Sequence, residues 1–252
     1  MLLTTELRPE WWPLFDPRIP NDVILRSALA GRCPGVACAD HGNHPKQIVV
    51  RAHGGKAFAS AAASESFLHA AIDQAGKLGW TALADTGIPE SVRARGRVVA
   101  RTRFGRCDLG GEALRSLRDQ LPVDLAVRLL DRGLLPRCHH ARRELPRYYG
   151  DRLDSYFDFG YGVCLLFDGD VVCEAYMAYV AQGRAEVNVG TVESFRGRGL
   201  ASIASAFLAE EARQRGHEFT WSCITDNAGS MKVARRLPFR SEEPYREIYY
   251  KL

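Results

Sequence analysis

The stretch Val189-Gly-Thr-Val-Glu-Ser-Phe-Arg-Gly-Arg-Gly-Leu-Ala201 joins an expected strand to an expected helix through a turn rich in arginine and glycine. Glycines in such a turn allow several backbone N–H groups to converge on one anion, because glycine adopts conformations that a Cβ disfavours. The helix adds the unpaired N–H groups of its first turn and the positive end of its dipole. This combination of strand, turn and helix indicates a phosphate-binding site.

The hydrophobic pattern supports both flanking elements. Upstream of the turn, residues 185–191 alternate between apolar and polar side chains, as a strand does. Downstream, apolar residues recur at the 3.6-residue spacing of a helix until Gly216, which is a typical helix stop. These apolar positions are Leu200, Ile203, Ala204, Phe207 and Leu208.

A second block, Trp221-Ser-Cys-Ile-Thr-Asp-Asn227-Ala-Gly-Ser230, follows after one helix and one strand. Together with Arg196-Gly-Arg-Gly199 it resembles the acyl-CoA-binding motifs of the GCN5-related N-acetyltransferase (GNAT) superfamily. The Trp-x-Cys…Asn-x-x-Ser form is most similar to the subfamily typified by the zwittermicin A resistance acetyltransferase. The resemblance is specific over residues 155–252 and weaker over the first half.

The resemblance implies an acyl-CoA donor, most simply acetyl-CoA. Its pantetheine arm would lie beside the strand that ends at Thr191, and a backbone N–H of Val189, Gly190 or Thr191 would polarise the thioester carbonyl. Asn227 and Ser230 would contact pantetheine, and Asn227 also suits a helix N-cap. The pyrophosphate would lie on the turn, formed by Arg196, Gly197, Arg198, Gly199, Leu200 and Ala201.

The catalytic groups are less evident, because Ala234 stands where many family members carry the tyrosine that protonates the departing thiolate. Tyr245 and Tyr249 are the candidate replacements, with strand packing as the structural alternative. Glu186 is the expected general base, with a surface cross-strand pair as its alternative. Pro238, where the family usually has glycine, predicts a different helix end.

Composition describes an ordinary globular protein of 252 residues, with 46% hydrophobic and 25% charged residues and a formal net charge of +4. There is no apolar run long enough to span a bilayer, and residues 1–15 do not resemble a signal peptide. The seven cysteines are scattered, so we expect reduced thiols in a cytoplasmic protein without a membrane or metal partner.

The fold class is predicted as α/β, in the sense of a mixed α+β sheet. A proline-flanked basic segment, residues 135–146, suggests a boundary between an accessory domain (1–135) and a catalytic GNAT domain (136–252). The first half reads as a helix, two short strands, a further strand or short turn (56–61) and a helix, an order compatible with a degenerate GNAT-like half. In the second half, Asp168-Gly-Asp170 predicts a hairpin, and residues 247–251 a last strand.

A basic segment fits the acetyltransferase interpretation poorly. Arginines at alternating positions would share one face of an extended strand, either as a solvated edge or as a track for a polyanion. These positions are Arg93, Arg95, Arg97, Arg101 and Arg103. The track suggests an alternative function, a GNAT-fold transferase that takes its acyl group from aminoacyl-tRNA.

The sequence therefore predicts an N-acyltransferase that passes an acyl group from acyl-CoA to the amine of a small metabolite or natural product in a ternary complex. The tRNA-dependent transferase is the alternative. A non-catalytic binding protein is a third interpretation, against which the intact phosphate turn counts.

Overall fold

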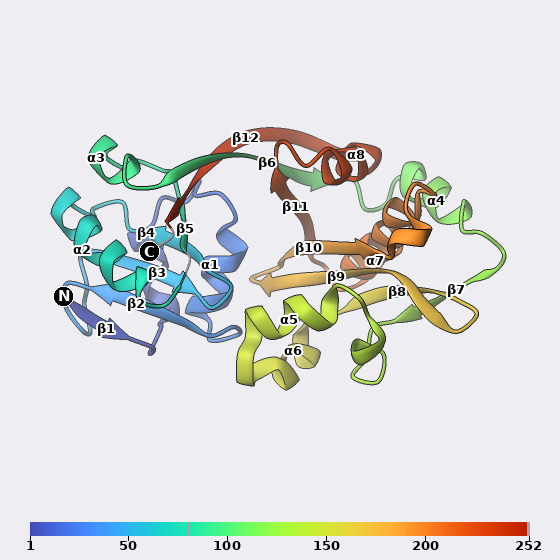
Figure 1. Ribbon diagram of the computed structural model, residues 1–252, viewed down its shortest axis with the longest axis horizontal. Helices are drawn as coiled ribbons and strands as arrows, with labels where there is room; N and C mark the ends of the chain where they lie inside the picture. The colour runs from blue at the N-terminus through green and yellow to red at the C-terminus, as the bar shows by residue number, and fades with distance from the viewer. Residues whose placement is uncertain (80, 251–252) are drawn as a thin grey trace. The chain divides into compact units, whose positions relative to one another are not determined.

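The computed structural model describes residues 1–79 and 81–250, which form two compact units (Figure 1). The N-terminal unit contains residues 1–101 and 244–252, and the C-terminal unit contains residues 102–243. This division differs from the boundary expected at residue 135. Residues 102–135 join the C-terminal unit because their helix α4 (Glu112–Asp119) packs on α7 (Leu200–Gln214) and their strand β7 (Leu125–Leu129) pairs with β8 (Gly162–Phe167).

The N-terminal unit is a mixed sheet with helices packed against it. Its strand order is β1-β2-β3-β4-β5-β12, with β4 and β5 parallel and the other pairs antiparallel. The elements are β1 (Leu2–Thr4), η1 (Pro9–Leu14), α1 (Asp22–Leu29), β2 (Gly35–Ala39), β3 (Ile48–Ala52), β4 (Lys56–Ala59), α2 (Glu65–Gly76), β5 (Thr81–Ala84), α3 (Glu90–Arg93), the start of β6 (Arg97–Cys107) and the end of β12 (Phe239–Tyr250).

The C-terminal unit carries a sheet in the order β11-β10-β9-β8-β7, in which only β10 and β11 run parallel. Helix α7 packs on one face of the sheet and α5 with α6 on the other (Figure 1). Besides α4, α7, β7 and β8, its elements are η2 (Leu135–Arg137), α5 (Ala141–Tyr149), η3 (Gly150–Arg152), α6 (Leu153–Phe159), β9 (Asp170–Ala181), β10 (Arg184–Thr191), η4 (Glu193–Phe195), β11 (Glu218–Ile224) and α8 (Ala228–Arg236).

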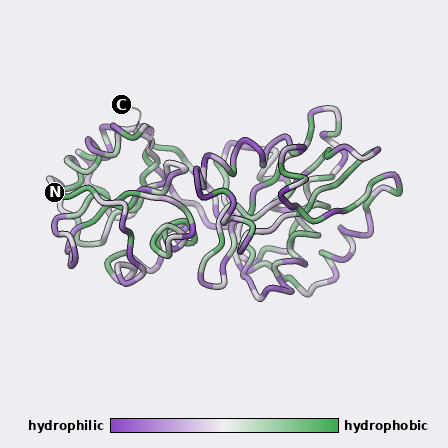
Figure 2. Tube along the Cα trace, turned by 90° about the horizontal axis from the view of Figure 1, so that it is seen from below, coloured by the Kyte–Doolittle hydropathy of each residue, from purple (hydrophilic) through white to green (hydrophobic). Residues whose placement is uncertain are grey.

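Each unit has its own hydrophobic core. In the C-terminal unit, buried residues of α7 such as Leu208 pack against strand residues such as Val187 and Phe219. In the N-terminal unit, α2 contributes Leu68 and Ile72 to a separate cluster. Figure 2 shows the hydrophobic segments that recur along the chain in both units, with hydrophilic segments between them. Two cores explain why contacts divide the chain into two units.

Most predicted elements are present, and three expectations need correction. Helix α5 begins inside the expected linker (135–146) and tolerates Pro146 inside it. Strand β12 is longer than predicted and already begins at Phe239, whereas Lys251, placed in that strand, lies outside the described residues. Arg93 and Arg95 are not in a strand, because α3 and a turn precede β6.

The hairpin and the altered helix end follow the sequence. Asp168 and Gly169 both adopt positive φ (47° and 83°), as the two central residues of a type I′ turn must. Helix α8 ends at Arg236, and Leu237 is extended (φ −86°, ψ 150°), because Pro238 disfavours helical geometry at the residue before it.

The parallel strands β10 and β11 separate after three paired residues. Arg184, Ala185 and Glu186 pair with residues 218–220, and within the described strands no pairing continues beyond Glu186. On its other side, β10 has a register shift against β9 between Glu186 and Val187. Such a bulge bends a strand and increases its twist. The two strands therefore form a fork, with Glu186 at its branch point.

Candidate functional site

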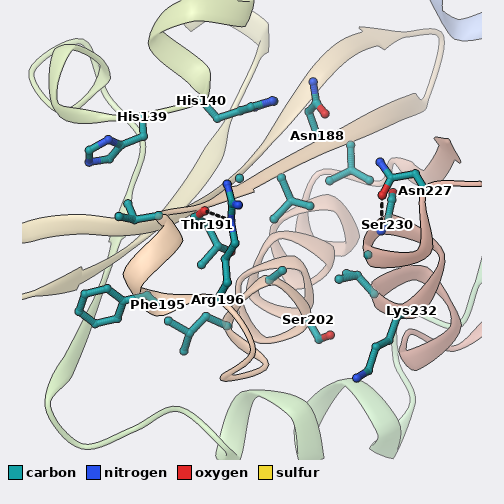
Figure 3. A pocket seen from close by; sticks show the side chains of 18 of the residues that line it. His139, His140, Asn188, Thr191, Phe195, Arg196, Ser202, Asn227, Ser230 and Lys232 are labelled. Atoms are coloured by element: carbon teal, nitrogen blue, oxygen red, sulfur yellow. Dashed lines mark hydrogen bonds between the residues drawn. The ribbon is translucent and has the colours of Figure 1, made fainter. Parts of the chain in front are cut away.

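A cavity of about 850 Å³ lies in the C-terminal unit, where β10 and β11 have separated. Residues 187–192 form one wall, and α8 with the start of α7 forms another. His139 and His140, which directly precede α5, also line the cavity beside β10 (Figure 3). The cavity thus contains the phosphate turn that the sequence predicts.

The turn between β10 and α7 presents free backbone N–H groups. Gly197 and Gly199 both have φ of 79°, the left-handed region that glycine enters without steric cost. Gly199 is the N-cap of α7, and no side chain of the described residues caps this helix. Within the part of the chain that the structure describes, the N–H groups of residues 197–201 have no acceptor. Five successive donors at the start of a 15-residue helix are suited to an anion.

The two arginines of the turn lie differently. Arg196 lines the cavity and its Nε donates to the carbonyl oxygen of Thr191 (3.2 Å). Arg198 is not among the lining residues; it donates to the carbonyl oxygen of Ser194 (3.3 Å) and stacks over the ring of Phe195 (4.6 Å). Of the two, Arg196 is the one placed to meet a ligand.

The cavity wall is strongly positive. Two cations come from α5, one from the turn and two from α8, whereas Glu193 is the acid among the described lining residues. The cations are Arg142, Arg143, Arg196, Lys232 and Arg236. Among the described residues, Arg236 bonds to the neutral amide of Gln120 (3.2 Å) and to no acid, so its charge is not neutralised there. This charge balance favours a polyanionic ligand.

Asn227 and Ser230 line the same cavity and also hold α8 in place. The Asn227 side chain accepts a hydrogen bond from the N–H of Ser230 (3.0 Å), which makes it the N-cap. The Ser230 hydroxyl accepts from Nε1 of Trp221 (3.0 Å). The predicted start of α8 therefore fixes the positions of the Asn227 and Ser230 side chains at the cavity.

Glu186 is buried at the fork and is not among the residues that line the cavity. Its carboxylate accepts hydrogen bonds from the hydroxyls of Thr220 (2.8 Å) and Ser222 (2.7 Å) on β11. Ser222 does line the cavity. The structure therefore connects Glu186 with the cavity through one serine hydroxyl.

Tyr245 and Tyr249 belong to the N-terminal unit and are not among the cavity residues. The Tyr245 hydroxyl accepts from Nδ2 of Asn21 (2.7 Å) and from Nε of Arg101 (2.6 Å). The Tyr249 hydroxyl accepts from Nη1 of Arg101 (3.3 Å). The structure does not bring either phenol together with the other predicted site residues.

The arginines of the expected polyanion track are largely engaged by acids. Arg93 bonds to Asp85, Arg95 to Asp73 and Arg103 to Glu243. Arg101 is buried beside Glu247 (3.4 Å), and Arg97 lies over the ring of Tyr249 (5.9 Å). Since Arg93 and Arg95 also lie outside the strand, the prediction of one continuous arginine face is wrong.

No pattern in the sequence predicts the contribution of α5 and the residue before it to the cavity. His140 stands directly over Gly190: a Cβ built on Gly190 would lie 2.5 Å from the Cβ of His140. The carboxylate of Glu174 receives the backbone N–H groups of His140 and Ala141, which fixes the start of α5 against the sheet. These residues reach the cavity through the tertiary packing of α5 on the sheet, which no local sequence pattern records.

This close approach predicts that Gly190→Ala destabilises the C-terminal unit. Neither Cβ can move without its backbone, so we expect the free energy of unfolding to fall by about 1–3 kcal/mol. Denaturant unfolding would measure the change, with Gly110→Ala as the control because an added Cβ meets nothing within 4 Å there. An equal, small effect of both substitutions would contradict the packing described.

A model of the GNAT acetyltransferase family matches residues 14–248. The chain belongs to this family. GNAT proteins are acyltransferases, and the match extends over both units of the chain. The fork, the phosphate turn and the capped helix α8 are the parts of this GNAT fold that form the cavity.

Individual relatives support the assignment. The chain is 30% identical over 132 residues to the uncharacterized N-acetyltransferase YdfB of Bacillus subtilis (strain 168), a match that covers 52% of this chain and 50% of the relative. The chain thus spans about half the length of this curated relative. The crystal structure of a GCN5-related N-acetyltransferase-like protein from Streptococcus suis 89/1591 has a TM-score of 0.73 at 25% identity, over 96% of this chain and 97% of the other.

The fold also resembles that of a tandem GNAT protein from the clavulanic acid biosynthesis pathway, with a TM-score of 0.61 at 10% identity over 97% of this chain and 92% of the other. This likeness concerns the fold alone. It is consistent with two GNAT-like halves in this chain, of which the C-terminal unit carries the phosphate turn. Among the described residues, no helix combines the length and apolarity needed to cross a bilayer.

Proposed function

We propose that the protein transfers an acyl group, most simply acetyl, from acyl-CoA to the amine of a small metabolite or natural product, by direct attack in a ternary complex. The observation that carries the proposal is the row of free N–H groups at residues 197–201, on the edge of a cavity with five cations. A diphosphate is the part of CoA that suits such a row. In this proposal the C-terminal unit is catalytic and the N-terminal unit is accessory.

The fork suits the pantetheine arm. Beyond Glu186 the edge of β10 that faces β11 has no strand partner, so its backbone groups are available to a ligand. Pantetheine contains two amides, which can pair with an open strand edge as a peptide does. The thioester carbonyl would then meet a backbone N–H of residues 189–191, and Asn227 with Ser230 would contact the arm from α8.

The reaction needs a nitrogen nucleophile that has lost its proton. We propose that Glu186 removes this proton through Ser222, since the serine hydroxyl lines the cavity and donates to the carboxylate. The choice of a natural-product acceptor rests on the resemblance to the zwittermicin A resistance subfamily alone. A cytoplasmic location belongs to the same proposal and rests on the scattered cysteines.

Aminoacyl-tRNA remains the alternative donor. It is less well supported than acyl-CoA, because four of the five arginines on which it was based lie beside acids in the structure. The aminoacyl-tRNA donor is therefore treated as one outcome of the donor-binding test below.

Thermal unfolding with and without acetyl-CoA tests the donor. At a donor concentration of one hundred times Kd, binding adds roughly 2.7 kcal/mol. Since each kcal/mol moves a chain of this size by about 2–4 °C, we expect Tm to rise on the order of 5–10 °C. Arg196→Ala should reduce the rise much more than Arg198→Ala, because only Arg196 lines the cavity. No rise in well-folded wild-type protein would refute the acyl-CoA site and direct the search to aminoacyl-tRNA.

A further inference from the structure

His140 is the imidazole that the structure places over the proposed thioester position. Its Cβ and Cγ stand 2.5 and 3.0 Å from the point where Gly190 would carry a Cβ. Gly190 is the middle residue of the segment 189–191 proposed to hold the thioester carbonyl. His140 lines the cavity, and in Figure 3 its ring extends from the N-cap position of α5 along β10 towards Asn188.

The ring is held through one nitrogen and leaves the other available. Nδ1 lies 3.0 Å from the hydroxyl of Tyr176, on the neighbouring strand β9. Among the described residues, no partner bonds to Nε2. The backbone at His140 is fixed in turn, because its N–H donates to the carboxylate of Glu174. An imidazole anchored at one nitrogen and open at the other is the arrangement that proton transfer requires.

The surroundings favour the neutral form of this imidazole over the protonated form. Burial lowers the pKa of His140 from its usual value, and Arg143 on the same helix acts in the same direction. Glu144 on α5 and Glu174 on β9 oppose this effect without reversing it. Burial raises the pKa of the Tyr176 phenol well above the usual value, which makes it a weaker acid than an exposed tyrosine.

We propose that His140 carries the second proton of the reaction from the attacking nitrogen to the departing sulfur. This inference rests on the proposed function. An ammonium acceptor loses two protons, one before its nitrogen attacks and one as the amide forms. The first leaves through Ser222 to Glu186. The second passes from the nitrogen of the tetrahedral adduct to Nε2, and from Nε2 to the sulfur when the C–S bond breaks and its electron pair goes to sulfur.

The role requires one tautomer and supplies what Ala234 cannot. Nδ1–H must donate to the hydroxyl oxygen of Tyr176, so that Nε2 presents its lone pair to the cavity. The thiolate then receives its proton from His140, because the methyl group of Ala234 carries no acidic proton. Tyr176 is a positioning residue in this arrangement, since it acts only through the ring.

Turnover of acetyl-CoA with a panel of polyamines, aromatic amines, amino sugars and amino acids tests the inference, with thiol release as the readout. We expect His140→Gln to lower kcat about 100-fold or more, which is the usual contribution of a positioned acid–base group. The rise of kcat through the histidine pKa on the acid side should disappear. The Tm shift with acetyl-CoA should stay as in the wild type, and added imidazole should restore part of the activity of His140→Ala.

His217→Gln is the matched control. His217 also contacts a tyrosine hydroxyl through Nδ1, that of Tyr161 at 3.0 Å, but it is not among the cavity residues. It should retain the wild-type pH profile. Tyr176→Phe should lower kcat less than His140→Gln and leave KM for the donor unchanged.

The inference is overturned if His140→Gln keeps kcat within twofold, or if its loss lies wholly in donor binding with the acid limb intact. Should no amine of the panel react, NMR of the imidazole carbons decides. The His140 signals, assigned by their disappearance in His140→Gln, should move when acetyl-CoA is added. Unmoved signals in a protein whose Tm rises with acetyl-CoA would refute the role of His140 and leave the donor site standing. Absence of the Tm rise itself would instead refute the proposed function.

Discussion

Replacing Ala201 by aspartate is expected to weaken acetyl-CoA binding strongly while the donor-free protein becomes more stable. Ala201 is the second residue of α7 and lines the cavity beside the free N–H groups of the phosphate turn. A carboxylate at this position gains from the helix dipole, so the free energy of unfolding should rise by about 0.3–1 kcal/mol. The same carboxylate occupies the donors that the diphosphate needs and repels its charge.

The expected loss of affinity is large. Two unit charges about 5 Å apart repel by roughly 3 kcal/mol at the effective dielectric of a protein surface, which corresponds to a loss of about 100-fold or more in Kd. Calorimetric titration with acetyl-CoA would measure the affinity, and denaturant unfolding the stability. Ala201→Asn is the control, because it has the same size without the charge and should retain more of the affinity.

The opposite changes in affinity and stability distinguish this prediction from a general loss of folding. A variant that unfolds more easily loses ligand binding for trivial reasons, whereas Ala201→Asp should bind worst and be the more stable protein. If it binds acetyl-CoA with wild-type affinity, the diphosphate does not lie on this turn and the acyl-CoA site is misplaced.

The part of the site that is local in sequence could be predicted. The turn depends on Gly197 and Gly199, and a glycine-rich sequence predicts their positive φ. It also depends on the start of α7, which the regular spacing of apolar residues predicts. Asn227 likewise caps α8 within three residues of itself. Local backbone preferences determine such features, and these preferences depend on residues that are close in sequence.

The part of the site that depends on tertiary packing could not be predicted from the sequence. His140 reaches the cavity because α5 lies over Gly190, fifty positions further along the chain, and no periodicity records this contact. The alternation of arginines from Arg93 to Arg103 is misleading for the same reason. Arg95 and Arg103 are paired with Asp73 and Glu243, acids that are distant in sequence, and Arg93 is paired with Asp85. A helix also interrupts the expected strand. The boundary at residue 135 differed because β7 and α4 pack with elements that follow them.

Glu186→Gln is expected to lower turnover at neutral pH about 100-fold while leaving acetyl-CoA binding unchanged, because glutamine cannot accept the proton of the acceptor. The substitution keeps the size of the side chain and one carbonyl acceptor for the hydroxyls of Thr220 and Ser222. Steady-state kinetics with the reactive amine of the panel, together with the donor-induced Tm shift, would separate kcat from binding.

The position of Ser222 makes a second variant informative. If the proton reaches Glu186 through the serine hydroxyl, Ser222→Ala should reproduce most of the kcat loss, and the double variant should be little worse than either single one, since both remove the same path. Thr220→Val should cost less, because Thr220 holds the carboxylate without lining the cavity. Additive losses in the double variant would mean that Glu186 only supports the fork, and the first proton would then have to leave to solvent directly.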